Sequence, residues 1–309
     1  MKYLVTGGAG FIGSHLCDLL VKEGHEVVVF DDLSTGKVEN VVGGGIKLIP
    51  HSMGNYEALL AEARDVDWIV HLAATVGVKN TMDNTASLIR NNINNTDMIL
   101  KLAAVLDKPV FFASTSEAYG KTIQVPMKES TESVFGAPDV IRWSYGQSKA
   151  IGEALANFYA KDRGLKFITG RIFNSVGPRQ SGSYGMVLPR FIESAKASEP
   201  INIYGSGLQT RSFCHVKDTV AGIYALTQSG RFGEAYNIGS DEETSILNLA
   251  DMVIRRVGSM SGVNFVSYED AYGPGYEDTS RRVPDITKIN IHTGWKPTKT
   301  LEQIIGDMT

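Results

Sequence analysis

The sequence predicts an α/β fold in which a doubly wound parallel sheet is followed by a smaller C-terminal α/β region. Three observations lead to this prediction. In residues 1–170, short apolar runs alternate with segments of helical spacing. A turn with three regularly spaced glycines follows the first of those runs, and beyond residue 171 the alternation becomes irregular. A chain of 309 residues can form one large core or two units that share a cleft.

The first half is expected to alternate strands and helices, as a parallel sheet requires. Strands are predicted where apolar residues run together, and helices where apolar residues recur every three or four positions. The predicted strands are 3–5, 26–30, 46–50, 67–74, 109–113 and 167–174, and the predicted helices are 15–21, 86–106 and one that runs through Tyr145 to about residue 161.

The second half, residues 171–309, is expected to form mainly the smaller unit, with residues at about 210–240 returning to the main sheet. The predicted elements are helices at 188–196, 217–228 and 245–257, a strand at 201–204, apolar stretches at 211–216 and 235–239, and a short last helix at 301–305. No repeat or low-complexity linker separates the two halves.

The glycine turn predicts a binding site for a dinucleotide. Gly7, Gly10 and Gly13 allow the backbone to turn tightly, to approach a pyrophosphate and to pack the following helix against the strand. The helix N-terminus then offers unpaired N–H groups to the phosphates. Asp31 and Asp32 follow the second predicted strand, where a carboxylate can bind both ribose hydroxyls and would repel a 2′-phosphate. The pattern indicates a Rossmann-type domain over residues 1–170 and favours NAD over NADP.

Small residues end the fourth predicted strand and suit a close approach of the same cofactor. The expected cofactor contacts are Gly7, Gly10, Phe11, Ile12, Gly13, Asp31, Asp32 and Ala73, together with Tyr145 and Lys149.

Composition excludes several other classes of function. A net charge of −4 without a basic run argues against binding to nucleic acid. The two cysteines lie far apart, and the six histidines form no ligand cluster, so no metal site is expected. The N-terminus has no apolar stretch of signal-peptide length and no segment approaches a membrane span, so a cytoplasmic protein without membrane contact is expected.

A pair of residues at helical spacing predicts base chemistry. Tyr145 and Lys149 lie four positions apart, so on a helix they share one face. A nearby ammonium favours the phenolate form of a tyrosine and so lets it act as a base. Thr115 and Glu117 directly follow the fifth predicted strand, and ligands meet the carboxyl ends of strands in open parallel sheets.

Several ordered motifs together resemble one known family. They are residues 6–13, Asp31, 71–74, 114–120, Tyr145 with Lys149, 171–174, 177–179, 205–211 and 282–285. From end to end the chain resembles the extended short-chain dehydrogenases/reductases, in the family of NAD-dependent nucleotide-sugar epimerases, dehydratases and decarboxylases.

The resemblance implies a role for each matching residue. Tyr145 is expected to take the proton of the sugar 4-hydroxyl while a hydride leaves C4 for NAD. Lys149 is expected to lower the pKa of the phenol and to bind the nicotinamide ribose, and Thr115 to share a hydrogen bond with the hydroxyl. Asn174, Arg211 and Arg282 match positions that bind the substrate diphosphate, and Val187 a position near the nucleotide base. Arg179 and Arg190 are expected to be surface residues.

The resemblance leaves the reaction open among enzymes that share a 4-keto intermediate. Dehydration is disfavoured because Ser116 replaces an expected aspartate. The run 177–191 resembles the epimerase branch, so a C4-epimerase of a UDP-hexose, UDP-N-acetylhexosamine or UDP-uronate is favoured. The alternative is a UDP-glucuronate decarboxylase that uses Glu117. Residues 142–145 also resemble the corresponding segment of such decarboxylases. A non-catalytic NAD-binding sensor is a remote alternative, since Tyr145, Lys149 and both arginines are present.

Two further expectations depend on the resemblance. Family members usually pair through two helices each, so a homodimer is expected through the 86–106 helix and the helix that carries Tyr145. Ser52 stands where the family often has an acid after the third strand, which leaves the adenine contacts open.

Overall fold

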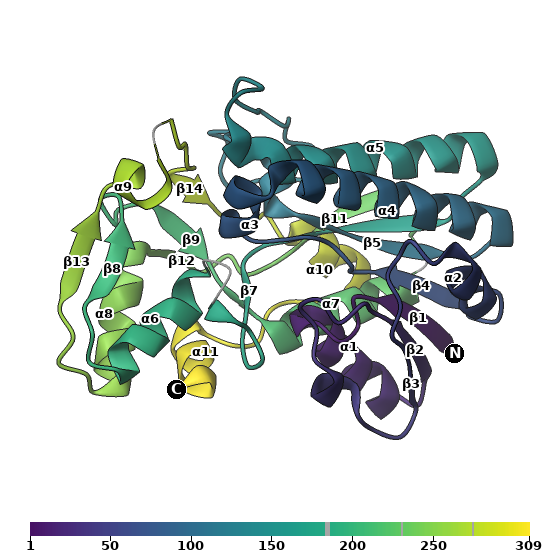
Figure 1. The fold of residues 1–309 in the computed structure, drawn as a ribbon, viewed down its shortest axis with the longest axis horizontal. Helices are drawn as coiled ribbons and strands as arrows, with labels where there is room; N and C mark the ends of the chain where they lie inside the picture. The colour runs from purple at the N-terminus through teal and green to yellow at the C-terminus, as the bar shows by residue number, and fades with distance from the viewer. Residues whose placement is uncertain (183–185, 230, 274) are drawn as a thin grey trace.

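The computed structural model describes residues 1–182, 186–229, 231–273 and 275–309, so part of the run 177–191 lies outside the described residues. The main sheet has the strand order β11-β6-β5-β4-β1-β2-β3, with every neighbouring pair parallel (Figure 1). Its strands are β1 (Lys2–Thr6), β2 (Glu26–Phe30), β3 (Ile46–Ile49), β4 (Trp68–His71), β5 (Val110–Thr115), β6 (Phe167–Ile172) and β11 (Glu234–Ile238).

Helices cover both faces of this sheet, so its strands are apolar on both sides. Tyr3 and Val5 of β1 belong to the core cluster on the face covered by α1 (Phe11–Lys22) and α7 (Val216–Ser229). Leu4, between them, belongs to the cluster on the opposite face. That face carries α2 (Tyr56–Ala63), α4 (Thr85–Leu106) and α5 (Ser144–Arg163) (Figure 1). The sequence-predicted doubly wound, Rossmann-type sheet is confirmed.

The direction of winding reverses between β1 and β4. The chain proceeds from β1 through β2 to β3 on one side, and from β4 through β5 to β6 on the other. The loops that follow β1 and β4 therefore diverge, and the ligand crevice of open α/β sheets is expected at this point, at the carboxyl ends of the strands.

The second half forms a smaller unit with its own apolar core. Buried side chains of α6 (Val187–Lys196), α8 (Ile246–Val257) and α11 (Leu301–Met308) form this core. Its strands are β8 (Ile201–Tyr204) paired with β13 (Val263–Val266), and a sheet in the order β12 (Glu243–Ser245), β9 (Thr210–Ser212), β14 (Arg281–Arg282). Shorter elements are β7 (Ser175–Val176), β10 (Cys214–His215), α3 (Val78–Asp83), α9 (Tyr268–Tyr272), α10 (Thr287–Thr293), and the 3-10 turns η1 (Val38–Val41), η2 (Ser116–Tyr119) and η3 (Ile141–Trp143).

Several element boundaries differ from the prediction. The strand predicted over 167–174 ends at Ile172, and Asn174 adopts a φ of 30°, which no strand accommodates. The stretch 211–216 divides into parts of β9 and β10 and the start of α7. The last helix extends beyond Ile305 to Met308, and the side chains of Thr300 and Gln303 cap its N-terminus.

Candidate active site

The glycine turn lies at the carboxyl end of β1 and allows only glycine at two of its positions. Gly7 has a φ of +70°, and a Cβ there would lie 2.8 Å from the backbone nitrogen of Ala73. A Cβ on Gly13 would overlap the carbonyl oxygen of Gly7. A Cβ on Gly10 would meet only that same oxygen, at 3.3 Å. The turn is thus closed towards the sheet and open at Gly10, as a backbone cradle for a pyrophosphate requires.

Asp31 lies beside this turn. Its carboxylate accepts hydrogen bonds from the backbone N–H of Ala9 at 2.9 Å and of Leu33 at 2.8 Å. Burial raises the pKa of Asp31, and the two hydrogen bonds oppose that rise. Each carboxylate oxygen can accept a further bond, so ribose hydroxyls can still be bound. Asp32 and Ser52 are both exposed, and Asp32 accepts a hydrogen bond from Ser34.

Helix α5 carries Tyr145 in its first turn and Lys149 one turn later, as predicted. The Lys149 ammonium is buried and donates to the carbonyl oxygen of Ala113 on β5, at 2.8 Å. Burial lowers the pKa of Lys149 to about 8, although the nearby charge of Glu153 opposes this shift. Burial and the charge of Lys149 lower the pKa of His71 to about 3, so His71 is neutral.

The expected lowering of the Tyr145 pKa does not hold for the protein by itself. Burial raises the pKa of the Tyr145 phenol, and the negative charge of Glu117 raises it further. A hydrogen bond with the side chain of Thr115 acts in the opposite direction. The Thr115 hydroxyl also accepts a bond from the backbone N–H of Glu117 at 3.2 Å, so it joins the strand end to the phenol.

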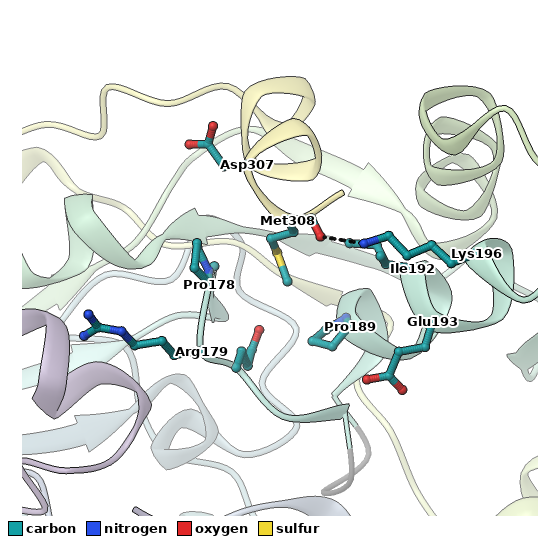
Figure 2. Close-up of a pocket in the computed structure, with 10 residues that line it drawn as sticks. Pro178, Arg179, Pro189, Ile192, Glu193, Lys196, Asp307 and Met308 are labelled. Atoms are coloured by element: carbon teal, nitrogen blue, oxygen red, sulfur yellow. Dashed lines mark hydrogen bonds between the residues drawn. The ribbon is translucent and has the colours of Figure 1, made fainter. Parts of the chain in front are cut away.

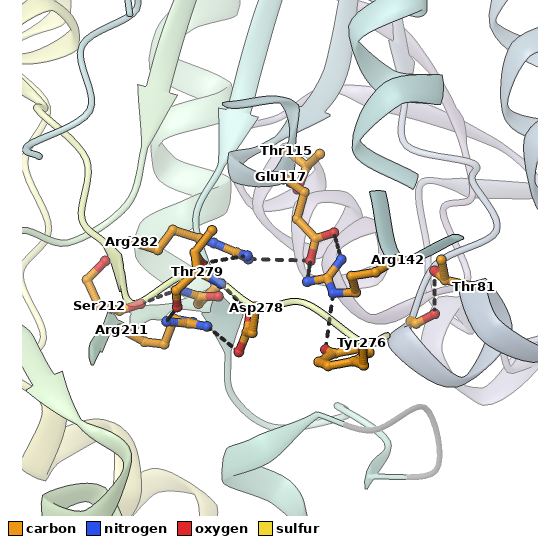
Figure 3. Close-up of polar contacts among 12 residues, drawn as sticks. Thr81, Thr115, Glu117, Arg142, Arg211, Ser212, Tyr276, Asp278, Thr279 and Arg282 are labelled. Atoms are coloured by element: carbon orange, nitrogen blue, oxygen red, sulfur yellow. Dashed lines mark hydrogen bonds and ion pairs between the residues drawn. The ribbon is translucent and has the colours of Figure 1, made fainter. Parts of the chain in front are cut away.

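Glu117 is held by two arginines (Figure 3). Its carboxylate accepts two hydrogen bonds from Arg142, at 2.6 and 3.0 Å, and one from Nη1 of Arg282, at 3.3 Å. Burial raises the pKa of Glu117, but the charges and hydrogen bonds of Arg142 and Arg282 outweigh it and lower the pKa to about 2. Glu117 is therefore an ionised carboxylate at neutral pH.

Arg211 and Arg282 lie on the paired strands β9 and β14, which align them as neighbours. Arg211 donates to the carboxylate of Asp278 at 2.8 Å and to the carbonyl oxygen of Thr279 at 2.9 Å. Arg282 is nearly buried, and within the described residues its Nε atom has no hydrogen-bond partner. A buried guanidinium with an unpaired N–H is suited to bind an anion that enters the site.

One pocket brings together most of the predicted substrate residues, although Thr115 does not line it. Glu117, Asn174, Val187, Arg211 and Arg282 all contribute to its wall. The side chain of Asn174 donates to the carbonyl oxygen of Ser212 at 2.7 Å.

Sequence reasoning missed several residues of this wall. Arg190, which we expected at the surface, lines the pocket with its guanidinium 4.1 Å from the ring centre of Tyr204. Arg142, Tyr272, Tyr276 and Asp278 also line it. Nothing in the local pattern around Arg190, Tyr272, Tyr276 or Asp278 identifies them, whereas Arg142 lies in the run 142–145 that resembles decarboxylases and precedes Tyr145 by three residues.

A second hollow lies between α6 and α11 (Figure 2). Arg179, Glu193, Lys196 and Asp307 contribute to its wall. Arg179 forms an ion pair with Asp18 of α1 at 2.9 Å, in agreement with the expected surface role. The hollow contains none of the predicted catalytic residues.

In the described ranges, no group of three or more His, Cys, Asp or Glu side chains could hold a metal ion. Over the same part of the chain, no helix combines the length and the apolar character needed to span a bilayer.

The fold and the site together define a dinucleotide-binding α/β protein with a tyrosine–lysine pair at the carboxyl end of its sheet. Residues 3–239 match the model of the NAD dependent epimerase/dehydratase family. The chain belongs to this family, and its cofactor is NAD, as the sequence predicts.

Relatives and solved structures agree with this membership. The chain is 40% identical to a UDP-N-acetyl-alpha-D-glucosaminuronate decarboxylase of Bacillus cytotoxicus over 98% of this chain and 94% of the relative. It is 37% identical to UDP-glucuronic acid decarboxylase 1 of Xenopus tropicalis, over 98% of this chain and 70% of the relative. The structure of a UDP-glucuronic acid 4-epimerase from Bacillus cereus, with UDP-glucuronic acid and NAD, superposes with a TM-score of 0.88 at 29% identity, covering 100% and 98% of the two chains. These proteins support a nucleotide sugar as substrate but do not distinguish an epimerase from a decarboxylase.

Proposed function

We propose that the protein is an NAD-dependent decarboxylase of a UDP-uronate, either UDP-glucuronate or its 2-acetamido counterpart. The observation that carries the proposal is the position of Glu117 between Arg142 and Arg282 in the wall of the pocket. The pocket wall carries four arginines, Arg142, Arg190, Arg211 and Arg282, against the two carboxylates of Glu117 and Asp278, and this excess of positive charge suits a substrate with a carboxylate in addition to its diphosphate. The decarboxylases among the relatives support this choice over the epimerase favoured by sequence alone.

The cofactor is proposed to bind in the crevice of the main sheet, with residues 1–170 contributing most of the contacts. Gly7, Gly10, Gly13 and the first residues of α1, Phe11 and Ile12, would hold the pyrophosphate, because their backbone forms the open side of the cradle. Asp31 would bind the adenosine ribose, with Asp32 and Ala73 nearby. When bound, NAD accepts the C4 hydride, returns it later and supplies a positively charged nicotinamide ring.

Tyr145 is proposed to remove the proton of the sugar 4-hydroxyl. Its phenol needs stabilisation as phenolate, because burial and Glu117 oppose ionisation. Thr115 supplies a hydrogen bond, and the Lys149 cation lies one helical turn away. The pair then returns the proton when the C4 ketone is reduced, so the site ends in the state in which it began.

Decarboxylation follows from the chemistry of the 4-keto sugar. The carboxylate on C5 is then β to a ketone, so the C5–carboxylate bond can break with its electron pair delocalised into an enolate. CO₂ leaves, and C5 takes a proton before C4 is reduced. Glu117 is ionised and cannot supply that proton, so we assign it the role of orienting the water molecule that does, and the hydroxide left behind takes up a proton from the solvent.

The substrate diphosphate is proposed to bind to Arg211, Arg282 and Asn174, and the base to lie near Val187. Arg282 contributes an N–H group without a partner in the described structure, and Arg211 lies beside it on the neighbouring strand. These contacts would come mainly from residues 171–309. Two guanidinium groups match the several acceptors of a diphosphate.

A C4-epimerase of the same UDP-uronates is the second candidate. The similarity to the UDP-glucuronic acid 4-epimerase structure and the run 177–191 favour it. Epimerisation needs the same oxidation at C4, followed by return of the hydride to the other face of the sugar. The two reactions therefore share Tyr145, Lys149 and Thr115 and differ in the fate of the C5 carboxylate.

The test is NMR of the products formed from UDP-glucuronate and from UDP-N-acetylglucosaminuronate by the purified protein. The proposal predicts release of CO₂ and formation of a UDP-pentose from one of the two, with UDP-glucose and UDP-N-acetylglucosamine unchanged. A C4 epimer that retains its carboxylate would establish the second candidate instead, and absence of any turnover would contradict both.

We also propose that the protein acts as a homodimer in the cytoplasm. Helices α4 and α5 lie side by side on one face of the sheet (Figure 1). Their outer surface exposes Val105, Ile151 and Phe158, which a second copy of the same two helices could cover.

A further inference from the structure

The two arginines on Glu117 are bound unequally. Arg142 makes two parallel bonds of 2.6 and 3.0 Å to the two carboxylate oxygens, whereas Arg282 makes one contact of 3.3 Å. Bidentate pairing of this kind fixes orientation as well as charge. Arg142 is therefore the principal counter-ion of Glu117.

Arg142 is itself fixed in place. Its side chain is buried, and its Nε donates to the hydroxyl of Tyr276 at 3.1 Å. Its guanidinium lies 5.5 Å from the ring centre of Trp143 and 5.9 Å from that of Tyr276. Tyr276 stacks on Tyr272 with ring centres 4.2 Å apart. The Tyr276 hydroxyl occupies the Nε edge of the guanidinium, so Arg142 can reach no anion other than Glu117 without leaving these contacts (Figure 3).

Arg282 is in a different state. Its Nη2 donates to Thr279 at 3.2 Å, its Nη1 makes the longer contact with Glu117, and its Nε is buried without a partner among the described residues. Unpaired buried donors are costly, and they are found where a ligand supplies the acceptor. Arg282 is therefore only weakly engaged by the protein's own carboxylate.

We propose that Arg142 is a positioning residue that engages Glu117 so that Arg282 remains available to the diphosphate of the substrate. The inference depends on the proposed function in one respect, namely that a nucleoside diphosphate occupies this pocket. Without Arg142, Arg282 would be the only one of the two arginines left to bind the Glu117 carboxylate. The carboxylate would then compete with the diphosphate for the same guanidinium, because both are anions that accept bonds from its fork.

The test is a double-variant cycle on the binding of UDP to the NAD-saturated protein, measured by titration calorimetry. Arg142→Met is expected to weaken UDP binding about tenfold, because the Glu117 carboxylate then competes with the diphosphate for Arg282. Glu117→Gln alone is expected to bind UDP as tightly as the unaltered protein or more tightly, because Arg282 is then free of its carboxylate. The double variant Arg142→Met/Glu117→Gln is expected to recover the affinity of the unaltered protein within about twofold.

A structural role for Arg142 would give a different result. If Arg142→Met and the double variant bind UDP equally weakly, Arg142 does not act through Glu117 and the proposal is wrong. If Arg142→Met does not fold, Tyr276→Phe removes only the hydroxyl that holds Arg142, and it should weaken UDP binding in a way that Glu117→Gln again reverses. A loss with Tyr276→Phe that Glu117→Gln fails to reverse would also refute the proposal.

Lys121→Met is the matched control for the segment that carries Tyr276. Lys121 is exposed, forms an ion pair with the next residue of that segment, Glu277, at 3.0 Å, and does not line the pocket. A loosening of the segment by itself would weaken UDP binding in this variant as well, and unaltered UDP binding is the expected result. Because UDP carries no sugar, the cycle is independent of turnover. Normal UDP binding without conversion of any UDP-uronate would refute the proposed function. The role of Arg142 would then be decided by the results of the double-variant cycle alone.

Discussion

Tyr145 illustrates how the surroundings of a residue decide its chemistry. Spacing alone indicates a tyrosine beside a lysine, but the phenol lies in a buried site next to the ionised Glu117, and both features raise its pKa. The Lys149 ammonium is engaged by the carbonyl of Ala113 rather than free beside the phenol. Base catalysis thus requires the positive charges of lysine and cofactor to act together against burial.

Replacement of Tyr145 by phenylalanine should therefore abolish turnover and leave cofactor binding intact. The change removes the only group proposed to accept the C4 proton, and loss of a general base costs on the order of 10²–10⁴ in rate. Product formation by NMR and the NAD content of the purified protein are the two measurements. Turnover within about tenfold of the unaltered protein would mean that another group removes the proton.

The buried ammonium of Lys149 should lower the free energy of unfolding, although the proposed reaction needs it. Its pKa in the folded protein is about 8, below the ordinary lysine value, so the fold disfavours the charged form. The unfolded chain then binds more protons between the two pKa values, and stability rises with pH in that window. The destabilisation by the charged Lys149 is complete below about pH 8 and diminishes above that pH.

Lys149→Met should accordingly raise the melting temperature at pH 7 while it abolishes turnover. The gain over the unaltered protein should shrink as pH rises above about 8 towards the ordinary lysine value of about 10.4. Thermal unfolding without added NAD, at pH 7 and pH 9.5, is the measurement. A variant that melts lower at pH 7 would show that the bond to Ala113 outweighs the cost of the buried charge.

At the scale of elements, helix α5 aligns a series of functional side chains at intervals of four residues. Tyr145, Lys149 and Glu153 follow one another along one face. Glu153 forms a partly buried ion pair with Arg171 of β6 at 2.7 Å and accepts a hydrogen bond from the hydroxyl of Ser114 on β5. The helix is thereby fastened to two central strands directly beyond the turn with Tyr145 and Lys149, which fixes the position of Lys149.

The glycine turn is the other element whose geometry can be tested. Gly13→Ala should lower both NAD affinity and stability, because its Cβ would overlap the carbonyl of Gly7 and separate α1 from the turn. Such overpacking costs about 1–3 kcal/mol. Gly43→Ala is the matched control, since a Cβ there meets nothing within 4 Å. Equal effects of the two substitutions on NAD binding, measured by calorimetry, would contradict this account of the turn.

At the scale of the whole molecule, the features that could be predicted from sequence are those that depend on residues close together along the chain. The glycine turn, the tyrosine–lysine pair and the alternation of strands and helices are local patterns, and the predicted fold agrees with them. The contact of Arg142 with Tyr276 joins residues 134 positions apart, and no periodicity relates them. The tyrosines of the pocket wall and Arg190 were missed for the same reason, because only the folded smaller unit brings them to the site.

Assembly is the remaining property of the whole molecule that can be argued from its surface. Ile151 and Phe158 are seven residues apart on α5, so they lie on one face, and they are 44% and 56% exposed. Isolated exposed apolar residues are common, but two on the helix that carries Tyr145, the proposed base, would couple assembly to the proposed activity. Phe158→Glu should place a charge in the proposed interface and yield a monomer by light scattering. Ile291→Glu on α10, where the side chain is 71% exposed on the opposite face of the sheet, is the control and should leave the mass of the assembly unchanged. A dimer that persists in Phe158→Glu, or a monomer in both variants, would exclude the α4–α5 face as the specific interface.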